Sequence, residues 1–290
     1  MQTISEIKRP ALRYYGGKWK LAPWIISHFP KHENYVEPCG GAASVLLQKP
    51  RSPLETYNDL DENVTNFFKV LRDYPTEFIR LLELTPWSRK EYLECTVKTG
   101  NPIEDARRFA VICWMSISQS YRRSDSGCHL AHDVRKYYSL TNFTFPDGEQ
   151  LQSISNRFKS VQIECLPAIE CIKKYDNDGA LIYFDPPYVK STRSAKETYM
   201  IEWEDEHHEE AAEFLHDSQG MVVVSGYQNT IYERLYERYG WQRVDRESQV
   251  NGGDKRVESL WLSPRTSAGL RCNNRLHATG KGGEQNWLFN

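Results

Sequence analysis

Residues 180–188, ALIYFDPPY, are the stretch of the sequence that decides the fold. The first five residues form an apolar run of the kind that lies buried on both faces of a parallel sheet. Asp185 follows this run directly, and the two prolines after it fix the backbone because their rings lock φ and remove the N–H donor. Ligands of open α/β sheets bind beyond the carboxyl ends of the strands. The stretch therefore predicts a parallel sheet with a functional site at the end of this strand.

Short strand-like runs alternate with helical patterns on both sides of this stretch. Apolar residues recur at helical spacing from Val64 to Leu71, within a predicted helix over 61–71. A second helix is predicted over 205–217, where acidic residues from Asp205 onward occupy the first turn. The other predicted strands are 35–37, 54–58, 161–163, 221–224, 241–244 and 257–262. Such alternation predicts parallel pairing through right-handed crossovers and therefore the α/β class.

The alternation stops between residues 75 and 158, where helical patterns dominate. These patterns cover 77–84, 89–98 and 104–121. We therefore predict a discontinuous main domain, 1–74 and 159–263, with 75–158 inserted as a mainly helical second domain. After Pro264 the sequence becomes polar and rich in Gly and Asn, which indicates a flexible tail over 264–290.

The composition is that of a soluble globular protein, with 39% hydrophobic and 26% charged residues. No apolar run reaches the ~20 residues of a membrane span, and the N-terminus lacks the apolar core of a signal peptide, so we expect a cytoplasmic protein. Seven cysteines without a CxxC pair or a zinc-binding spacing favour reduced thiols and no metal site. The formal net charge is -2, but residues 107–136 carry six basic residues against two acidic ones, a local charge compatible with DNA binding.

The DPPY segment offers two hydrogen-bond acceptors in fixed positions. The Asp185 carboxylate and the Pro186 carbonyl can together accept both N–H bonds of an exocyclic amine, and Tyr188 can stack on the heterocycle that carries the amine. Accepting both hydrogens draws the nitrogen toward tetrahedral geometry and raises its nucleophilicity. The alternative is a proline-rich strand end with a structural tyrosine.

Three other segments carry residues suited to binding a ligand. The Gly-rich turn EPCGGAAS, residues 37–44, allows close approach to the backbone, although a tight turn alone explains it equally well. Asp59 lies where nucleotide-binding α/β folds bind ribose hydroxyls, with capping of the following helix as the alternative. In RYYGGK, residues 13–18, the lysine could contact a carboxylate and a tyrosine could contact a base, or the segment could be an ordinary turn.

Together these segments resemble the Dam-like, or D12, class of adenine-specific DNA methyltransferases, over residues 10–263. The order is Gly-Gly-Lys, then the Gly-rich turn, a helical insert and DPPY, which is the order of the α group of amino-methyltransferases. The resemblance implies a Rossmann-like sheet that uses S-adenosylmethionine, with 75–158 as the target-recognition domain. The leading Asp of DPPY points to N6 of adenine, because related cytosine-N4 enzymes usually begin that motif with Ser.

The resemblance also implies roles for individual positions. The cofactor would be held by Tyr14, Lys18, Glu37, Cys39, Gly41, Asp59 and Asp185. The catalytic platform would consist of Asp185, Pro186, Pro187 and Tyr188. Two positions depart from the family's cofactor turn, because Cys39 replaces the usual Phe and Ala43 replaces the second Gly. Neither a metal ion nor a covalent intermediate is required, since the sulfonium methyl group is already activated.

The partner that the resemblance implies is double-stranded DNA, with the target adenine flipped out of the helix against Tyr188. The implied DNA-binding residues are Arg13, Arg122, Arg123, Lys190 and Tyr199. Arg122 and Arg123 would read guanine or contact phosphate, and the loop 190–199 would close over the DNA. GATC is the family's common target, the host would be a bacterial or phage-infected cell, and the sequence indicates no obligatory protein partner.

Other functions compete with this interpretation. The same cofactor and motif could serve methylation of RNA or of cytosine N4, and a relative without catalysis could bind DNA alone. A nucleotide-binding oxidoreductase lacks support, because the sequence contains no GxGxxG at the turn. His207 and His208 are predicted to be solvated surface residues rather than metal ligands.

Overall fold

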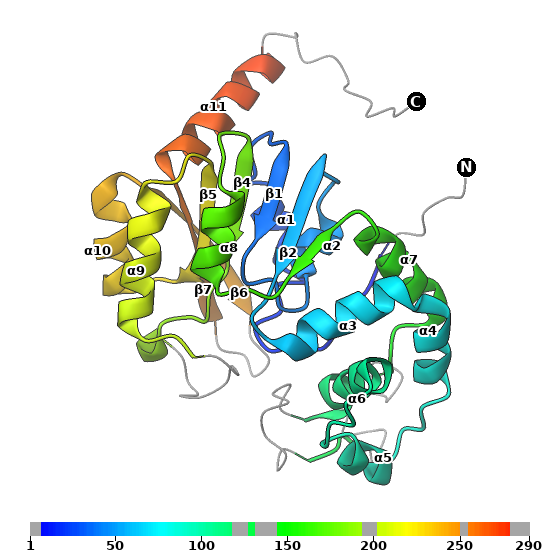
Figure 1. Ribbon diagram of the computed structural model, residues 1–290. Helices are drawn as coiled ribbons and strands as arrows, with labels where there is room; N and C mark the ends of the chain where they lie inside the picture. The colour runs from blue at the N-terminus through cyan, green and yellow to red at the C-terminus, as the bar shows by residue number, and fades with distance from the viewer. Residues whose placement is uncertain (1–6, 118–126, 131–143, 193–201, 250–254, 279–290) are drawn as a thin grey trace, which may run out of the picture.

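The computed structural model describes residues 7–117, 127–130, 144–192, 202–249 and 255–278, and a single sheet lies at its centre (Figure 1). Within these residues the sheet has seven strands in the order β3-β2-β1-β4-β5-β7-β6. Their bounds are β1 Asn34–Glu37, β2 Leu54–Asn58, β3 Gln162–Glu164, β4 Ala180–Phe184, β5 Met221–Tyr227, β6 Gln242–Gln249 and β7 Lys255–Leu262. Strands β1 to β5 pair in parallel, whereas β7 is antiparallel to both β5 and β6. The predicted α/β class is confirmed.

Strands β1 and β4 are neighbours at the point where the strand order reverses. From β1 the chain adds β2 and β3 on one side, and then returns to place β4 and β5 on the other. Val36 pairs with Ile182, so the turns that begin at Pro38 and Asp185 leave the same edge of the sheet. A reversal of this kind is where open α/β sheets bind ligands.

Helices cover both faces of the sheet and produce three layers (Figure 1). One face carries α1 Ala22–Ile26, α2 Ser44–Gln48 and α3 Glu62–Asp73, and the other carries α8 Ala168–Tyr175, α9 Asp205–His216 and α10 Thr230–Leu235. Strand β4 shows the reason, because Leu181 and Tyr183 join the first core while Ile182 and Phe184 join the second. All five β4 residues are buried, as the apolar run predicts.

The described residues of the region 75–158 are mainly helical and form four helices. These are α4 Pro75–Glu83, α5 Arg89–Glu94, α6 Pro102–Met115 and α7 Gly148–Phe158. Helices α6 and α7 pack against α3, and Phe158 stacks on Phe68 with 4.4 Å between ring centroids. The apolar core therefore continues from the sheet into the insert, and the domain limits at 75 and 158 stay a prediction.

Two of these helices end earlier than their patterns predict. Helix α5 ends at Glu94 and not at residue 98, and the chain turns where Asp105 accepts hydrogen bonds from the backbone N–H groups of Thr99 (2.7 Å) and Gly100 (3.0 Å). Helix α6 ends at Met115 and not at residue 121, because the next residue is extended and forms an antiparallel bridge to Cys128. Short-range hydrogen bonds and a non-local bridge thus override the helical spacing.

The flexible tail predicted over 264–290 is wrong for its first part, which forms helix α11 Pro264–Ala278. Thr266 is fully buried, and its hydroxyl donates to a β5 carbonyl oxygen 2.8 Å away. A Cβ atom at Gly269 would lie 2.9 Å from Pro30, so the helix approaches too closely for a larger residue there. Small and polar residues pack this helix on the sheet, a pattern that hydrophobic periodicity does not detect. Two short 3-10 helices, η2 Lys190–Thr192 and η3 Glu237–Tyr239, complete the elements.

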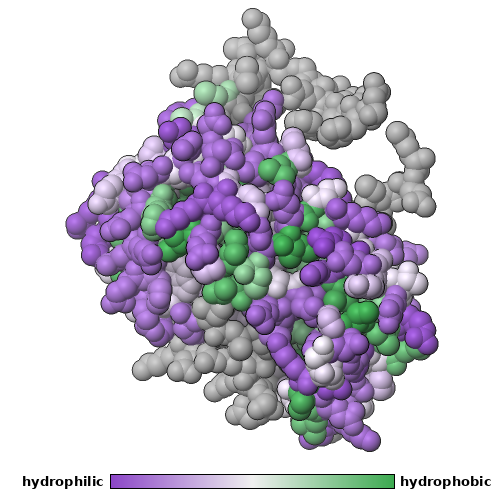
Figure 2. Space-filling view, in the orientation of Figure 1, coloured by the Kyte–Doolittle hydropathy of each residue, from purple (hydrophilic) through white to green (hydrophobic). Residues whose placement is uncertain are grey.

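The visible surface is mostly hydrophilic, with apolar side chains in small separate groups (Figure 2). In the described part of the chain, no helix combines the length and the apolar character needed to cross a membrane.

Candidate active site

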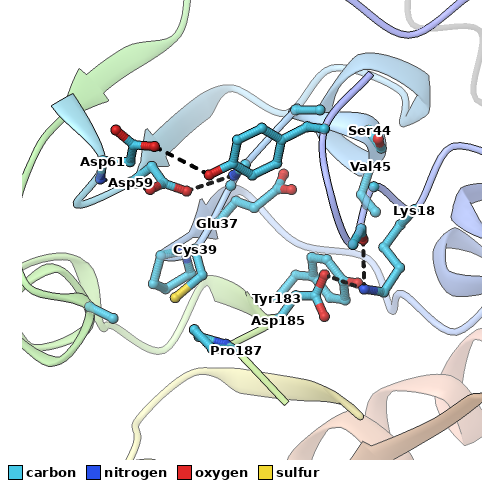
Figure 3. A pocket seen from close by; sticks show the side chains of 18 of the residues that line it. Lys18, Glu37, Cys39, Ser44, Val45, Asp59, Asp61, Tyr183, Asp185 and Pro187 are labelled. Atoms are coloured by element: carbon cyan, nitrogen blue, oxygen red, sulfur yellow. Dashed lines mark hydrogen bonds and ion pairs between the residues drawn. The ribbon is translucent and has the colours of Figure 1, made fainter. Parts of the chain in front are cut away.

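A pocket opens at the carboxyl edge of the sheet, beside the turns that follow β1, β2 and β4 (Figure 3). The segment 14–18 lines another side of the same pocket. Residues from all four segments that carry chemistry in the sequence therefore share one cavity, although they are spread over more than half of the chain. The reversal of strand order between β1 and β4 explains why they meet.

The turn after β1 requires glycine, and because glycine has no side chain, the backbone of this turn is open to the pocket. A Cβ atom at Gly40 would lie only 2.2 Å from the ring of Tyr57. The Tyr57 hydroxyl donates a 2.6 Å hydrogen bond to the Gly41 carbonyl oxygen, and Gly41 itself has a φ of 46°. Turn and strand are thus held together with no room for a side chain, and a ligand can approach the main chain.

Ala43 has a backbone conformation that alanine rarely adopts. Its φ of 54° lies in the left-handed region, and among the described residues it is the only non-glycine residue with a positive φ. The turn is closed by the Ala43 N–H, which donates to the Gly40 carbonyl oxygen at 2.7 Å. An alanine in this conformation stores local strain.

Asp59 braces the Gly-rich turn from the end of β2. Its two carboxylate oxygens accept hydrogen bonds from the N–H groups of Gly41 (2.7 Å) and Asp61 (2.9 Å). Burial raises the pKa of Asp59 to about 6, although both N–H donors oppose this rise. The alternative role for Asp59, capping of the following helix, is performed by Asp61, which accepts from the Asn63 N–H and caps α3. Asp59 is therefore left facing the pocket.

Glu37 ends β1 and is a deeply buried carboxyl group on the pocket wall. It is 2% exposed and accepts a 2.9 Å hydrogen bond from the Tyr35 hydroxyl. Burial raises the pKa of Glu37 to about 8, and the Tyr35 hydrogen bond only partly opposes this. At neutral pH the side chain is therefore mainly protonated in the free protein.

Lys18 and Asp185 form a buried ion pair at the pocket (Figure 3). The Lys18 Nζ atom lies 2.8 Å from Asp185 Oδ2 and 4.6 Å from the centroid of the Tyr188 ring. Burial acts to lower the pKa of Lys18, but the carboxylates of Asp185 and Glu258 outweigh it, so that this pKa is raised. The other oxygen of Asp185, Oδ1, is buried and has no partner among the described residues. The carboxylate that Lys18 contacts is thus part of the protein, in the DPPY segment, and a contact of Lys18 with a ligand stays a prediction.

Tyr188 is 5% exposed and is held by its hydroxyl group. The hydroxyl donates a 2.9 Å hydrogen bond to Glu258 Oε2 and lies 3.1 Å from Ser225 Oγ. Neither partner was predicted from the sequence, because they lie 70 and 37 residues away and no local motif marks them. The two prolines before Tyr188 are both at least half-buried, and Pro187 lines the pocket.

Two other expected cofactor residues also lie in the pocket. The Tyr14 hydroxyl donates a 3.3 Å hydrogen bond to Asp61, and the Tyr14 ring lies edge-on to Phe109 of α6. Cys39 is half-buried, and burial raises the pKa of its thiol well above the ordinary value. Its sulfur therefore adds a small neutral surface to the pocket.

The expected DNA-binding residues are only partly described by the structure. Arg13 donates a 2.9 Å hydrogen bond to the Trp114 carbonyl oxygen at the end of α6, and Lys190 pairs with Glu204. Arg122, Arg123 and Tyr199 lie outside the described residues, as does most of the loop 190–199. A contact of any of these five with DNA therefore stays a prediction.

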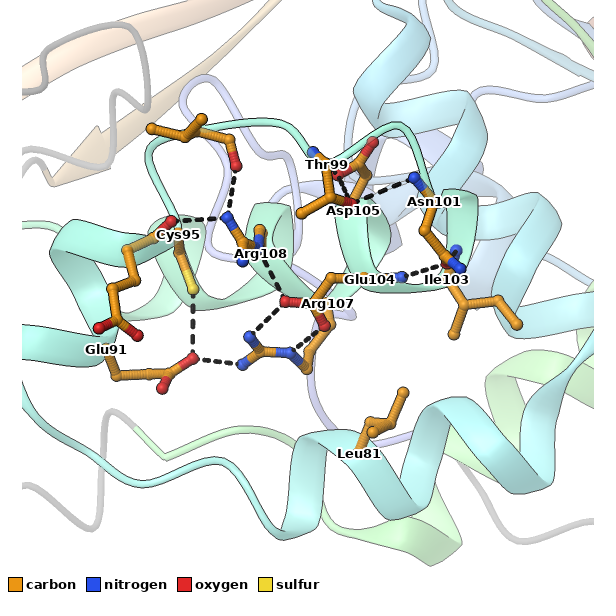
Figure 4. Close-up of polar contacts among 12 residues, drawn as sticks. Leu81, Glu91, Cys95, Thr99, Asn101, Ile103, Glu104, Asp105, Arg107 and Arg108 are labelled. Carbon is orange, nitrogen blue, oxygen red and sulfur yellow. Dashed lines mark hydrogen bonds and ion pairs between the residues drawn. The ribbon is translucent and has the colours of Figure 1, made fainter.

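The basic stretch that suggested DNA binding is partly neutralised within the insert (Figure 4). Arg107 pairs with Glu91 at 2.6 Å and with Glu104 at 2.7 Å, and Arg108 pairs with Glu104 at 2.7 Å. Both side chains are less than one quarter exposed. Two of the six basic residues therefore join α5 to α6 and contribute less to a positive surface than their number suggests.

The predicted surface location is wrong for His208 and correct for His207. His208 is 1% exposed, and its Nδ1 atom lies 3.1 Å from the Tyr232 hydroxyl oxygen. His207 is exposed, and its Nδ1 atom accepts from the Glu204 N–H in the cap of α9. The two histidines are adjacent in the sequence, but only His208 lies on the helix face that packs on α10. In the described ranges, no group of three or more His, Cys, Asp or Glu residues is arranged to hold a metal ion.

Known proteins resemble this chain over most of its length. The family model of the D12 class N6 adenine-specific DNA methyltransferases matches residues 14–250. The type II methyltransferase M.MjaIII of Methanocaldococcus jannaschii is 25% identical over 287 residues, covering 88% of this chain and 97% of its own. The type II methyltransferase M1.LlaDCHI of Lactococcus lactis subsp. cremoris is 26% identical over 261 residues, with 84% and 89% covered. The DNA adenine methylase of Escherichia coli strain K12 is 24% identical over 271 residues, with 87% and 94% covered.

Proposed function

Because the chain belongs to the D12 class of N6 adenine-specific DNA methyltransferases, we propose that its pocket binds S-adenosylmethionine and that the methyl group passes to N6 of an adenine flipped out of duplex DNA. The observation that carries the proposal is the Asp185 carboxylate. One of its oxygens contacts a lysine ammonium, and the other is buried without a partner among the described residues. Such an acceptor suits an N–H donor that arrives with a substrate.

The residues of the pocket fit S-adenosylmethionine in charge and in shape. Asp59 offers a carboxylate to ribose hydroxyls, and Glu37 offers one to the cationic methionine part. Gly40 and Gly41 allow the ligand to approach the main chain. The hydroxyl of Ser44 is buried at the pocket without a partner in the described ranges, and it suits a carboxylate or a polar ligand atom. The bound cofactor supplies a methyl group on a positively charged sulfur, which needs no metal for activation.

The protein's contribution to the reaction is to orient the amine. Asp185 and the Pro186 carbonyl oxygen accept hydrogen bonds from the two N6–H groups, and the Tyr188 ring supports the base. When N6 gains the methyl group and the bond from that group to sulfur breaks, N6 loses one proton, which the Asp185 carboxylate is placed to receive. In the free protein the Lys18 ammonium already lies against Asp185 and above the Tyr188 ring. A base that stacks on this face of the Tyr188 ring must therefore displace the lysine from it, and the buried Glu258 carboxylate nearby continues to stabilise the lysine charge.

The test is transfer of a labelled methyl group from S-adenosylmethionine to unmethylated DNA, with the modified bases then read by sequencing. We expect N6-methyladenine from the wild type and a loss of at least about 10²-fold in kcat from Asp185→Asn, the scale seen when one oriented transition-state partner is removed. The matched control is Glu213→Gln, which changes an exposed carboxylate of α9 and should leave the rate unchanged.

The same assay decides between acceptors. Label on RNA or on cytosine N4 would replace the proposed substrate, and no label with folded protein that binds the cofactor would leave a role in DNA binding alone. The resemblance to Dam-like enzymes supports GATC as the first target to examine. The sequence context of the methylated adenines tests this directly.

A further inference from the structure

Glu258 is a buried carboxyl group that contacts neither the cofactor nor the base in the proposed reaction. It lies on β7, where it pairs with Tyr227 of β5 in the antiparallel register, and it is 8% exposed. Its Oε2 atom accepts the 2.9 Å hydrogen bond from the Tyr188 hydroxyl. Strand β7 thus brings a carboxylate from near the end of the chain to the rear of the DPPY segment.

Keeping a carboxylate in this place carries a free-energy cost, because burial disfavours the charged form. Burial raises the pKa of Glu258, while the Lys18 ammonium and the Tyr188 hydrogen bond act against that rise. A buried carboxyl is tolerated when donors surround it, and here one donor is the aromatic residue of the motif itself. A purely apolar residue would fill the same volume without that cost.

The hydrogen bond limits how the Tyr188 ring can move. Tyrosine has two rotatable side-chain bonds, and an anchored hydroxyl fixes the far end of the ring and so restricts χ1. Because a phenolic O–H prefers to lie in the ring plane, a fixed acceptor also favours one ring plane at χ2. Ser225 provides a second contact to the same hydroxyl at 3.1 Å. The Tyr227 ring packs edge-on against Tyr188, with 4.7 Å between centroids and 79° between planes. The ring plane is therefore determined from three sides.

We propose that Glu258, together with Ser225, is a positioning residue that holds the Tyr188 ring in the plane on which the target base stacks. The inference rests on the proposed function, since it assigns the anchored ring to the methyl-accepting base. Glu258 acts through Tyr188 and does not line the cofactor pocket. Its loss should therefore lower kcat and leave the KM for S-adenosylmethionine unchanged.

The experiment compares Glu258→Gln with Glu258→Met in the full chain. Both substitutions remove the negative charge next to Lys18, but only Gln keeps an oxygen that accepts from the Tyr188 hydroxyl. We expect Glu258→Met to lower kcat about tenfold, the equivalent of about one net hydrogen bond. Glu258→Gln should stay within about threefold of the wild type. Equal activity of the two variants would overturn the proposal.

Tyr188→Phe provides the second arm, because it keeps the ring and removes the anchor. It should lose about as much kcat as Glu258→Met, and in the Tyr188→Phe background the difference between Met and Gln at position 258 should vanish. Full activity of Tyr188→Phe, or an undiminished difference in that background, would contradict the assignment. The comparison of Tyr188→Phe with the wild type also holds if Glu258→Met fails to fold, since Tyr188→Phe leaves the core volume nearly unchanged.

A melting-temperature cycle on the wild type, Glu258→Met, Tyr188→Phe and the double variant separates failure of this inference from failure of the proposed function. If Glu258 anchors Tyr188, Glu258→Met lowers the melting temperature less in the Tyr188→Phe background than in the wild type. If wild-type protein methylates no DNA but this non-additivity is present, the function is wrong and the anchor stands. Additive shifts in an active enzyme remove the anchor and leave the function intact.

Discussion

Replacing Glu37 by Gln should change how cofactor affinity depends on pH. In the free protein Glu37 is 2% exposed, and burial raises its pKa to about 8. If the ionised carboxylate faces the positive charges of S-adenosylmethionine, as we propose, binding must remove a proton from Glu37 near neutral pH. Proton release and cofactor binding are then linked, and affinity increases as the pH rises.

The size of the effect follows from the pKa. With a pKa of about 8, the ionised fraction of Glu37 increases about eightfold between pH 6.5 and 7.5. Because only the protein with ionised Glu37 is competent to bind the cofactor, the observed affinity is proportional to the ionised fraction. Asp59, with a pKa of about 6, is mostly ionised throughout this window and changes little. The ratio of the wild-type Kd to the Glu37→Gln Kd should therefore fall about eightfold across the window.

The assay is calorimetric titration of the wild type and Glu37→Gln at several pH values in this range. The comparison with the variant is needed because the cofactor's own α-amino group has a pKa of roughly 7.7–8.0 and begins to lose its proton. In buffers of different ionisation enthalpy, the wild type should release close to one more proton than the variant at pH 6.5. A constant Kd ratio with equal proton release would refute ionisation of Glu37 on binding.

The same pKa predicts how stability depends on pH without cofactor. The folded pKa of Glu37 lies above its ordinary value of 4.5, so this contribution to stability is complete below about 4.5 and is lost as the pH rises through about 8. Glu37→Gln should flatten this part of the stability profile in urea unfolding. A variant with the wild-type profile would show that the carboxyl is less buried than the structure indicates.

Three further substitutions test the packing around the site. In thermal melts, Glu55→Gln should lower the free energy of unfolding by about 3–5 kcal/mol, or Tm by about 10 °C, because it leaves two buried cations without their carboxylate. The control Glu94→Gln, at an exposed pair, should lower it by no more than about 0.5 kcal/mol. Ala43→Gly should raise the free energy of unfolding by up to about 1 kcal/mol in urea, since relief of the φ of 54° exceeds the entropy lost by glycine. Gly40→Ala forces a Cβ atom onto the Tyr57 ring and should weaken cofactor binding in titrations. Unchanged affinity would show that the turn tolerates a side chain.

The parts of the fold that could be predicted from the sequence are those with local causes. The strands β2 and β4 have the predicted bounds, 54–58 and 180–184, because each is a short run that is distinct from its neighbours. The four site segments could be found for the same reason, since a Gly-rich turn or DPPY is a contiguous pattern. The rule for strand ends explains why the turns after β1, β2 and β4 meet in one pocket, but the segment 14–18 follows no strand, and the rule does not place it.

The errors have non-local causes. Helix α11 packs through the buried Thr266 and through Gly269, which is small enough to lie close to Pro30. No periodic apolar face marks such packing. His208 is a polar residue but is buried, with its Nδ1 atom 3.1 Å from the Tyr232 hydroxyl oxygen and its ring packed against Trp203 and Tyr232. In each case the partner lies on another element, and a single sequence does not identify it.

The antiparallel strand β7 shows why part of the site must escape a motif search. A purely parallel sheet would place only crossover helices and strand ends near DPPY. Here β7 enters beside β5 in the opposite direction and brings Glu258 level with Tyr227, next to the Tyr188 hydroxyl. The residues that touch a ligand can form motifs, because they cluster in turns at the sheet edge. The residues that hold those side chains in place follow the pairing of the strands, and that pairing is visible only in the folded chain.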